Sequence, residues 1–266
     1  MNHLDAFIAR RRARIAVDFA GFDRIALEEL ASRGRPVRDF CGALQEGADV
    51  AVIAEIKKAS PSAGPILPDC DVAQRVRCYE RGGAAAISVL ADPDHFEGSF
   101  EDVETAARAI ELPVLCKDIV VSPAQLFAAR GHGADSCIVM LRVLGDDIRE
   151  YLDLAATLGM DLLVEVADMR ELKVAVATGS RLIGVNARDF RTLKIDLRVQ
   201  REIVAEAARS GATIVAASGI TRRSDVEAAA SAGADAVLVG ETLMRAADPE
   251  SALRELVGVG KEWSDV

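Results

Sequence analysis

Short apolar runs alternate with longer amphipathic segments along most of the chain. Each run is rich in Val, Ile, Leu or Ala with little alternation of polar residues, as expected of strands buried on both faces. Eight runs are predicted to be strands: Val50–Ala54, Ala85–Leu90, Pro113–Lys117, Ser136–Leu141, Asp161–Val166, Leu182–Asn186, Thr213–Ser218 and Ala236–Gly240. Between them the pattern predicts helices that include Ser122–Arg130, Ile148–Leu158, Met169–Thr178, Leu197–Arg209 and Arg223–Ala232.

Three joints between a predicted helix and the next strand have similar sequences. They are Arg81-Gly82-Gly83-Ala84-Ala85, Gly131-His132-Gly133-Ala134-Asp135 and Ser231-Ala232-Gly233-Ala234-Asp235. Glycine after a helix end permits a left-handed cap, and a small residue then enters the strand. The repeated joint indicates repeated βα units, and eight of these predict an α/β protein with the (β/α)8 barrel fold. An open doubly wound sheet is the alternative, but it would normally carry a glycine-rich fingerprint after its first strand.

The chain length suits a single barrel domain over residues 1–266, because such barrels commonly run to about 250 residues. Residues 1–48 precede the first predicted strand, and they contain the amphipathic pieces Leu4–Ile8 and Ile25–Leu30. We expect an N-terminal helical extension that packs on the barrel. The basic run Arg10-Arg11-Arg12-Ala13-Arg14 is expected to be an exposed face of a helix in this extension.

Composition narrows the classes of function. The chain has 42 acidic and 32 basic residues, and this net charge of −10 argues against a nucleic-acid-binding protein. Its five cysteines show no CxxC spacing, which favours reduced thiols, and its three histidines are scattered. We therefore expect no metal or cofactor. Without a long apolar stretch or a signal-type N-terminus, the protein is predicted to avoid membranes and to be cytoplasmic. The sequence indicates no oligomeric state.

Ionisable and polar residues collect where the predicted strands end. In (β/α)8 barrels the active site lies at the carboxyl ends of the strands. Residues at these ends are Glu55 and Lys57 after the first strand, Lys117-Asp118 after the third, Glu165 in the fifth, and Asn186 and Arg188 after the sixth. Two amines and two carboxylates in a semi-dry pocket can hold opposite protonation states, as general acid–base catalysis requires. The alternative is a buried ionic network that only fills the barrel mouth.

The last two strands are followed by glycine-containing turns that suit a phosphate. These are Ala217-Ser218-Gly219-Ile220-Thr221 and Val239-Gly240-Glu241-Thr242. Loops after the seventh and eighth strands often form the phosphate site of such barrels, with backbone N–H groups as donors. Ordinary βα turns are the alternative reading of these two segments.

Several motifs together resemble the indole-3-glycerol-phosphate synthase family of tryptophan biosynthesis, over roughly residues 38 to 255. They are Val52-Ile53-Ala54-Glu55-Ile56-Lys57-Lys58-Ala59-Ser60-Pro61-Ser62, Ile87-Ser88-Val89-Leu90, Phe96-Glu97-Gly98-Ser99, Leu112-Pro113-Val114-Leu115-Cys116-Lys117-Asp118, Leu163-Val164-Glu165-Val166, Ile183-Gly184-Val185-Asn186-Ala187-Arg188-Asp189, Ser218-Gly219-Ile220 and Leu238-Val239-Gly240-Glu241. The first of these is highly specific.

The resemblance implies a carboxy-lyase that closes the ring of 1-(2-carboxyphenylamino)-1-deoxyribulose 5-phosphate with loss of CO₂ and water. It implies that Lys117 is the general acid, that Glu165 and Glu55 move protons during dehydration, and that Asn186 orients the reacting oxygen. Lys57 would neutralise an anionic group of the substrate. Further substrate or phosphate contacts would come from Ser60, Arg188, Ser218, Gly219, Gly240 and Glu241, the last through its backbone with its side chain turned away.

The chain departs from the family pattern at four positions. Ala217 stands where the family usually has Glu, and Ala63, Cys116 and Ser122 replace commonly charged residues. The change at Ala217 removes an acid from the neighbourhood of Lys57. Three readings remain open: a working synthase, a paralog acting on a related aryl-amino sugar phosphate in a secondary pathway, and a non-catalytic ligand-binding barrel.

Overall fold

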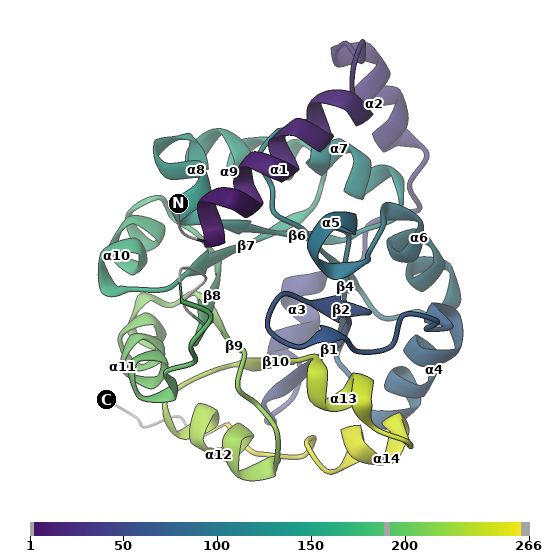
Figure 1. Cartoon of the computed structure of the whole chain (residues 1–266). Helices are drawn as coiled ribbons and strands as arrows, with labels where there is room; N and C mark the ends of the chain where they lie inside the picture. Colours follow the sequence, from purple (N-terminus) through teal and green to yellow (C-terminus); the bar gives the residue numbers. More distant parts are fainter. Residues whose placement is uncertain (1–2, 189–191, 262–266) are drawn as a thin grey trace.

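Eight parallel strands close into a barrel in the computed structural model, which describes residues 3–188 and 192–261. Neighbours follow the order β1-β10-β9-β8-β7-β6-β5-β4, and Figure 1 looks into the barrel along its axis. The strands are β1 (Ala51–Ile56), β4 (Ala86–Leu90), β5 (Val114–Lys117), β6 (Ser136–Met140), β7 (Asp161–Val166), β8 (Leu182–Asn186), β9 (Thr213–Ala217) and β10 (Ala236–Val239). The predicted (β/α)8 barrel and all eight of its strands are confirmed.

Helices surround the barrel and connect its strands. They are α4 (Val72–Gly82), α5 (Pro93–Phe96), α6 (Phe100–Ala109), α7 (Ala124–Gly131), α8 (Leu141–Leu144), α9 (Ile148–Thr157), α10 (Met169–Ala177), α11 (Leu197–Ala207), α12 (Arg223–Ser231), α13 (Glu241–Arg245) and α14 (Pro249–Arg254), with 3-10 turns at Gly145–Asp147 and Ala208–Ser210. The five helices predicted from the apolar pattern are present; four begin at the predicted residue, and the other ends differ by one or two residues. None of the helices within the described residues is long and apolar enough to cross a membrane.

Helix ends follow the local sequence signals. Asp71 and Asp196 cap α4 and α11 by accepting hydrogen bonds from backbone N–H groups of the first turn. At the three repeated joints Gly83, Gly133 and Gly233 have φ values of 94°, 84° and 93°, the left-handed conformation that ends a helix without a Cβ clash. The repeated joint therefore has the structural role that its sequence predicts.

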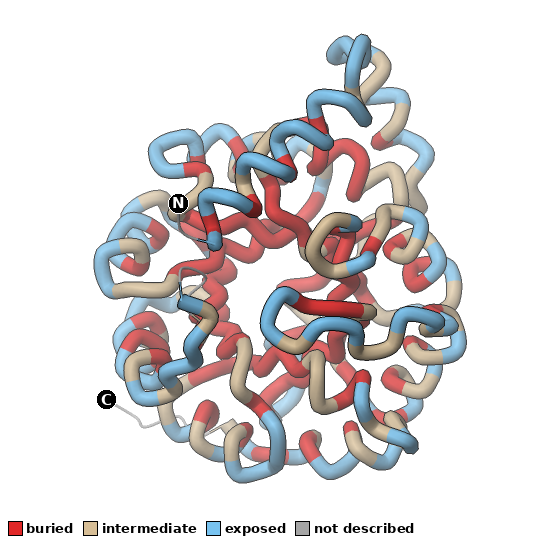
Figure 2. The backbone as a smooth tube through the Cα atoms, in the orientation of Figure 1, coloured by how far each residue is buried: buried red, intermediate tan, exposed pale blue. Residues whose placement is uncertain are grey.

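Two layers of apolar side chains bury both faces of the sheet. Figure 2 shows the strands of the barrel mostly in red, the colour of buried residues. The outer layer lies between the strands and the helices. The inner layer fills the barrel with inward-facing residues such as Ile53, Leu115 and Leu163. Phe40 and Leu44 of α3 (Phe40–Gln45) join this inner layer with no exposed surface. Because α3 hydrogen-bonds to the first residues of β7 and β9, it plugs the amino-terminal end of the barrel.

The first helix lies at the other end of the barrel, and the second lies outside the barrel wall. α1 (His3–Asp18) crosses the carboxyl ends of β6 and β7, and α2 (Arg24–Ser32) packs on α7 beyond the barrel wall (Figure 1).

The expectation that the arginine run forms an exposed face is wrong for Arg11, whose residue surface is only 1% exposed. Arg10, Arg12 and Arg14 are exposed as expected. A run of arginines covers more than one face of a helix, so one of them points into the protein.

A small antiparallel hairpin follows β1 and overhangs the barrel mouth (Figure 1). It pairs β2 (Ala59–Ser60) with β3 (Gly64–Pro65). Lys58, just before the hairpin, donates hydrogen bonds of 2.8 and 2.7 Å to the carboxylate of Asp102 in α6. This contact holds the hairpin against the rim, so that Ser60 faces the mouth.

Candidate active site

The predicted site residues gather at the carboxyl ends of the strands, where they line three adjoining cavities. The loop cavity, about 360 Å³, lies beside the turns after β9 and β10. The hairpin cavity lies under Ser60, Pro61 and Ser62. The apolar cavity lies beneath α1. Lys117 lines all three cavities, so its amine stands at their junction.

Glu55 bridges the two lysines of the site. Its Oε1 lies 2.9 Å from Nζ of Lys57, and its Oε2 accepts a hydrogen bond of 2.7 Å from Nζ of Lys117. The carboxylate is 1% exposed, whereas the two lysine side chains are 16% and 18% exposed. Burial by itself would raise the pKa of Glu55, but the two ammonium groups outweigh it and lower that pKa to about 2. Glu55 is therefore a fixed anion at neutral pH.

The bridge depends on a close approach by the last strand loop. A Cβ atom placed on Gly240 would stand 2.3 Å from Oε1 of Glu55 and 3.1 Å from Nζ of Lys57. Glycine at this position thus leaves the room in which the carboxylate and the amine meet. The sequence predicted Gly240 only as a phosphate-binding residue. Its closeness to Glu55 depends on the tertiary fold, so the spacing of residues along the chain could not indicate it.

Glu165 and Asn186 form a second polar group on the opposite wall. Nδ2 of Asn186 donates a hydrogen bond of 3.0 Å to Oε2 of Glu165, and Oδ1 of Asn186 accepts one of 2.9 Å from the backbone N–H of Arg188. Burial raises the pKa of Glu165, although nearby Lys117 and the Asn186 amide partly oppose that shift. The site thus holds one carboxyl group with a depressed pKa and another with a raised pKa, which suits them to different tasks.

The two glycine-containing turns lie side by side and line the loop cavity through Ser218, Gly219, Gly240 and Glu241. Ser218 and Gly219 both have left-handed backbone, with φ values of 70° and 81°. This conformation is rare for serine and turns the chain sharply at the mouth. Oε1 of Glu241 lies 2.9 Å from Nε of Arg245, so its carboxylate is engaged by its own helix α13.

Ser60 and Arg188 complete the predicted set. Ser60 is buried, and its Oγ accepts a hydrogen bond of 3.2 Å from the backbone N–H of Ala63 within the hairpin turn. NH1 of Arg188 donates one of 3.1 Å to the carbonyl of Leu193. Both residues line the hairpin cavity. Asp189, the last residue of the motif that contains Arg188, lies outside the described residues.

The structure adds residues that the sequence did not assign to the site. The apolar cavity is lined by Leu4, Phe7, Leu90, Phe96, Ile119, Ile138 and Met140, together with the ionisable residues Lys117, Asp118 and Glu165. Arg245 lines the loop cavity. The amphipathic pattern marked Leu4 and Phe7 as apolar positions, but nothing local indicated that their helix would cross the barrel mouth.

Ala217 is 2% exposed and lies in the barrel wall between Asn186 and Leu238. Its carbonyl accepts a hydrogen bond of 2.6 Å from Nε2 of Gln200, which also donates 2.8 Å to the carbonyl of Val185. The ends of β8 and β9 are thereby fixed from the helix side. Glu55 supplies the carboxylate for Lys57, while position 217 contributes only a methyl group.

The described part of the chain holds no group of three or more His, Cys, Asp or Glu side chains placed to hold a metal ion. The cysteines at positions 41, 70, 78, 116 and 137 are free, and three of them are buried. The chemistry that this geometry supports is proton transfer by an ammonium and a carboxylate, together with charge neutralisation of an anionic ligand.

Comparison with known proteins identifies similar chains. The family model described as indole-3-glycerol phosphate synthase matches residues 4–256. The protein of that name from Rhodococcus opacus (strain B4) is 39% identical over 98% of this chain and 96% of its own length. The one from Mycobacterium sp. (strain KMS) is 41% identical over 97% and 94%. Among solved structures, a 3-hexulose-6-phosphate synthase has a TM-score of 0.61 at 16% identity, covering 78% of this chain and 98% of that one, which supports the fold alone.

Proposed function

The chain belongs to the indole-3-glycerol phosphate synthase family, and from that premise we propose how its barrel mouth closes the indole ring. The family consists of carboxy-lyases of tryptophan biosynthesis. Their substrate, 1-(2-carboxyphenylamino)-1-deoxyribulose 5-phosphate, joins an aromatic acid to a sugar phosphate. It therefore has an aryl end, a carbonyl in the middle and a phosphate at the far end.

The phosphate is proposed to occupy the loop cavity. Gly219 and Gly240 bring backbone to its wall without side chains, and Lys57, Arg188 and Arg245 place positive charge on the same wall. The engagement of Glu241 by Arg245 keeps its carboxylate bound to α13. Backbone donors and cations together neutralise a dianion in a site partly shielded from water.

The aryl end is proposed to enter the apolar cavity. Its lining by Phe7, Phe96, Ile119 and Met140 suits an aromatic ring, and Lys117 and Glu165 stand at its edge. With the phosphate held in the loop cavity, the carbonyl of the substrate falls near the junction of the cavities. Holding the two ends separately brings the aromatic carbon and the carbonyl carbon together.

Lys117 is proposed to act as the general acid. The aromatic carbon that bears the carboxyl group attacks the ribulose carbonyl carbon, and the carbonyl oxygen takes a proton from the ammonium of Lys117. The bond to the carboxyl group then breaks, its electron pair restores the aromatic ring, and CO₂ leaves. The negative Glu55 holds the Lys117 ammonium at 2.7 Å, and this contact fixes the direction of the acid.

Glu165 is proposed to act as the general base. During dehydration the hydroxyl group formed from the carbonyl leaves as water. It takes a proton from one of the two lysine ammonium groups that Glu55 holds. The neighbouring methylene carbon gives its proton to Glu165. The raised pKa of Glu165 suits a carboxylate that must accept a proton from carbon. With a pKa of about 2, Glu55 orients the two amines more readily than it carries protons.

Beyond the active site, we propose that the whole chain is one barrel domain with residues 1–48 as an extension, and that it works in the cytoplasm. Its partner is a small phosphorylated anion, since a chain of net charge −10 is poorly suited to nucleic acid. The position of Ala217 does not favour a different substrate, because Glu55 already supplies a carboxylate to Lys57.

The single observation that carries the proposal is the placement of Lys117 at the junction of all three cavities. The test is to incubate purified protein with the substrate and to follow indole fluorescence and CO₂ release together. Equal amounts of both products are expected. Binding of the substrate without CO₂ release would instead identify a ligand-binding barrel, and CO₂ release without indole formation would identify a different reaction.

A further inference from the structure

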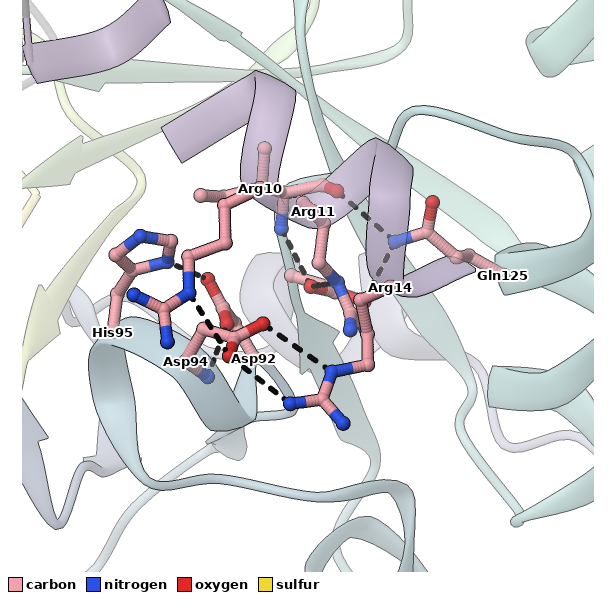
Figure 3. A network of polar contacts seen from close by, with 9 residues as sticks. Arg10, Arg11, Arg14, Asp92, Asp94, His95 and Gln125 are labelled. Carbon is pink, nitrogen blue, oxygen red and sulfur yellow. Dashed lines mark hydrogen bonds and ion pairs between the residues drawn. The ribbon is translucent and has the colours of Figure 1, made fainter. Parts of the chain in front are cut away.

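The basic run at the start of the chain takes no part in the proposed reaction, yet it fastens α1 to the barrel mouth (Figure 3). Arg10 and Arg14 each lie 3.1 Å from Oδ1 of Asp94 in α5. Phe7 packs on the ring of His95 at 4.4 Å between centroids. These contacts connect α1 to the loop after β4.

Arg11 makes a different contact, inside the protein. Its Nε and NH2 lie 2.9 and 2.5 Å from the two carboxylate oxygens of Asp118. The two side chains are 2% and 1% exposed. A two-point pair of this kind fixes direction as well as distance. It also cannot lose one member cheaply, since a buried partner charge would be left alone.

Asp118 directly follows Lys117, and its carboxylate organises the segment 118–122. It accepts hydrogen bonds of 2.7 Å from the backbone N–H of Ile119 and 2.7 Å from Nε2 of Gln125. Oε1 of Gln125 in turn accepts from the N–H groups of Val121 at 2.8 Å and Ser122 at 3.1 Å. The whole segment after β5 is thus tied to one carboxylate and one amide, both buried.

Consecutive residues at a strand end point to opposite sides. Lys117 accordingly reaches toward Glu55, while the carboxylate of Asp118 turns away from Glu55 and meets Arg11 beneath α1. Holding Asp118 in this place therefore restricts the backbone from which the Lys117 amine extends. Ile119, the next residue, lines the apolar cavity.

We propose that Arg11 is a positioning residue for the Lys117 acid, acting through Asp118 on the end of β5. The inference rests on the proposed function of Lys117. Loss of the guanidinium would leave the Asp118 carboxylate buried without its cation, and the segment would move to hydrate it. A displacement of about 1 Å at a reacting group can cost on the order of 100-fold in rate.

The test compares Arg11→Met and Arg11→Lys with Arg12→Met, which removes the neighbouring exposed arginine from the same helix. We expect Arg11→Met to lower kcat on the order of 10- to 100-fold with a much smaller change in KM. Arg11→Lys should fall between Arg11→Met and wild type, and Arg12→Met should match wild type. Asp118→Asn should lower kcat similarly, and the double variant with Arg11→Met no further, because both changes break one contact.

A second readout does not depend on activity. Hydrogen–deuterium exchange of the peptide 117–122 should accelerate in Arg11→Met, Arg11→Lys and Asp118→Asn and stay unchanged in Arg12→Met.

If Arg11→Met does not fold, the turnover and the exchange of Arg11→Lys and Asp118→Asn decide the test. Faster exchange with kcat within about twofold of wild type would reduce Arg11 to a structural role and overturn the inference. Unchanged exchange would overturn it as well. If the wild-type protein itself turns over no substrate, the proposed function fails, and the exchange result still decides whether Arg11 holds the segment.

Discussion

At the residue scale, one buried carboxylate orders the charges of the barrel mouth. Glu55 holds Lys57 and Lys117 on its two oxygens, and Glu165 pairs with an amide instead of an amine. The pKa of Glu55 is depressed and the pKa of Glu165 is raised, and in the proposed reaction Glu55 orients the amines while Glu165 transfers a proton. In a chain of net charge −10, this arrangement gathers positive charge where a dianionic substrate needs it.

The pH dependence of kcat tests that division. Glu165 must be ionised to accept a proton, and its pKa is raised above 4.5, so kcat should fall on the acid side with a midpoint above pH 4.5. Glu55, with a pKa of about 2, stays ionised there and contributes nothing to that limb. Its own ion pairs stabilise the fold at neutral pH, and this stability is lost as the pH falls from 4.5 toward 2.

Glu165→Gln should lower kcat by about 100-fold or more, because the variant lacks the general base. Asp153→Asn, at an exposed carboxylate of α9, should leave both rate and profile unchanged. An acid limb that persisted with its wild-type midpoint in the residual activity of Glu165→Gln would assign it to another group.

Gly240→Ala tests the close approach at the Glu55 bridge. A methyl group there would stand 2.3 Å from Oε1 of Glu55, so the carboxylate or the loop must shift. We expect kcat to fall by about 10-fold or more, because the Lys117 amine loses its fixed partner. Gly260→Ala is the matched control, since no atom lies within 4 Å of a Cβ at that position. Wild-type kcat in Gly240→Ala would show that the bridge geometry does not matter.

Ala217→Glu tests the departure from the family pattern. A carboxylate there would lie at the end of β9, next to Ser218, which shares two cavities with Lys57, and it would restore the residue that the resemblance implies. We expect activity to be retained or raised, because Lys57 then has a partner besides Glu55. Ala217→Gln, of similar size without charge, separates the effect of charge from that of volume. Complete loss of activity in Ala217→Glu alone would indicate a pocket rebuilt for another ligand.

Those residues of the candidate site that lie at strand ends could be predicted from the sequence. Glu55, Lys117 and Glu165 follow apolar runs, and parallel strands bring those ends together by necessity. The apolar cavity could not be read in this way. Phe7 and Phe96 reach it from α1 and from the turn of α5, and only the tertiary path of those segments brings them beside Lys117.

At the scale of elements, the strands were predictable because their apolar runs have no other stable place than a sheet buried on both faces. The burial of one arginine in the basic run of α1 was not predictable, because the spacing of residues does not tell which face of a helix is covered. Arg11 is buried because Asp118, more than 100 residues later in the chain, lies beneath it. α3 lies within the predicted helical extension, but nothing in its sequence indicated that it would close one end of the barrel.

The plug formed by α3 makes a stability prediction. Leu44 has no exposed surface and packs in the inner layer of the barrel. Leu44→Ala should lower the free energy of unfolding by about 2–5 kcal/mol, measured by urea denaturation. It should leave KM nearly unchanged because it lies at the far end from the mouth. Glu46→Ala, two residues on and exposed, should have no comparable effect on stability. Equal stability in both variants would contradict the role of the plug.

At the scale of the whole molecule, the barrel separates stability from chemistry. Its amino-terminal end is closed by α3, and its carboxyl end is left open for three cavities that meet at one amine. The hairpin after β1 and α1 cover that end from two sides (Figure 1). In the proposed reaction, the aromatic end of the substrate meets the apolar cavity and its phosphate end meets the basic wall of the loop cavity.

The most direct measurement is the turnover number of Lys117→Ala beside that of the wild type, in an assay that follows indole-3-glycerol phosphate by fluorescence. Wild-type protein should form product, and the variant should lose on the order of 10²- to 10⁴-fold in kcat, the range expected for a general acid. Its circular dichroism spectrum should match wild type, and its unfolding midpoint should fall only modestly, because Glu55 keeps Lys57 as an ion-pair partner. A folded Lys117→Ala variant that turned over substrate at the wild-type rate would contradict the account.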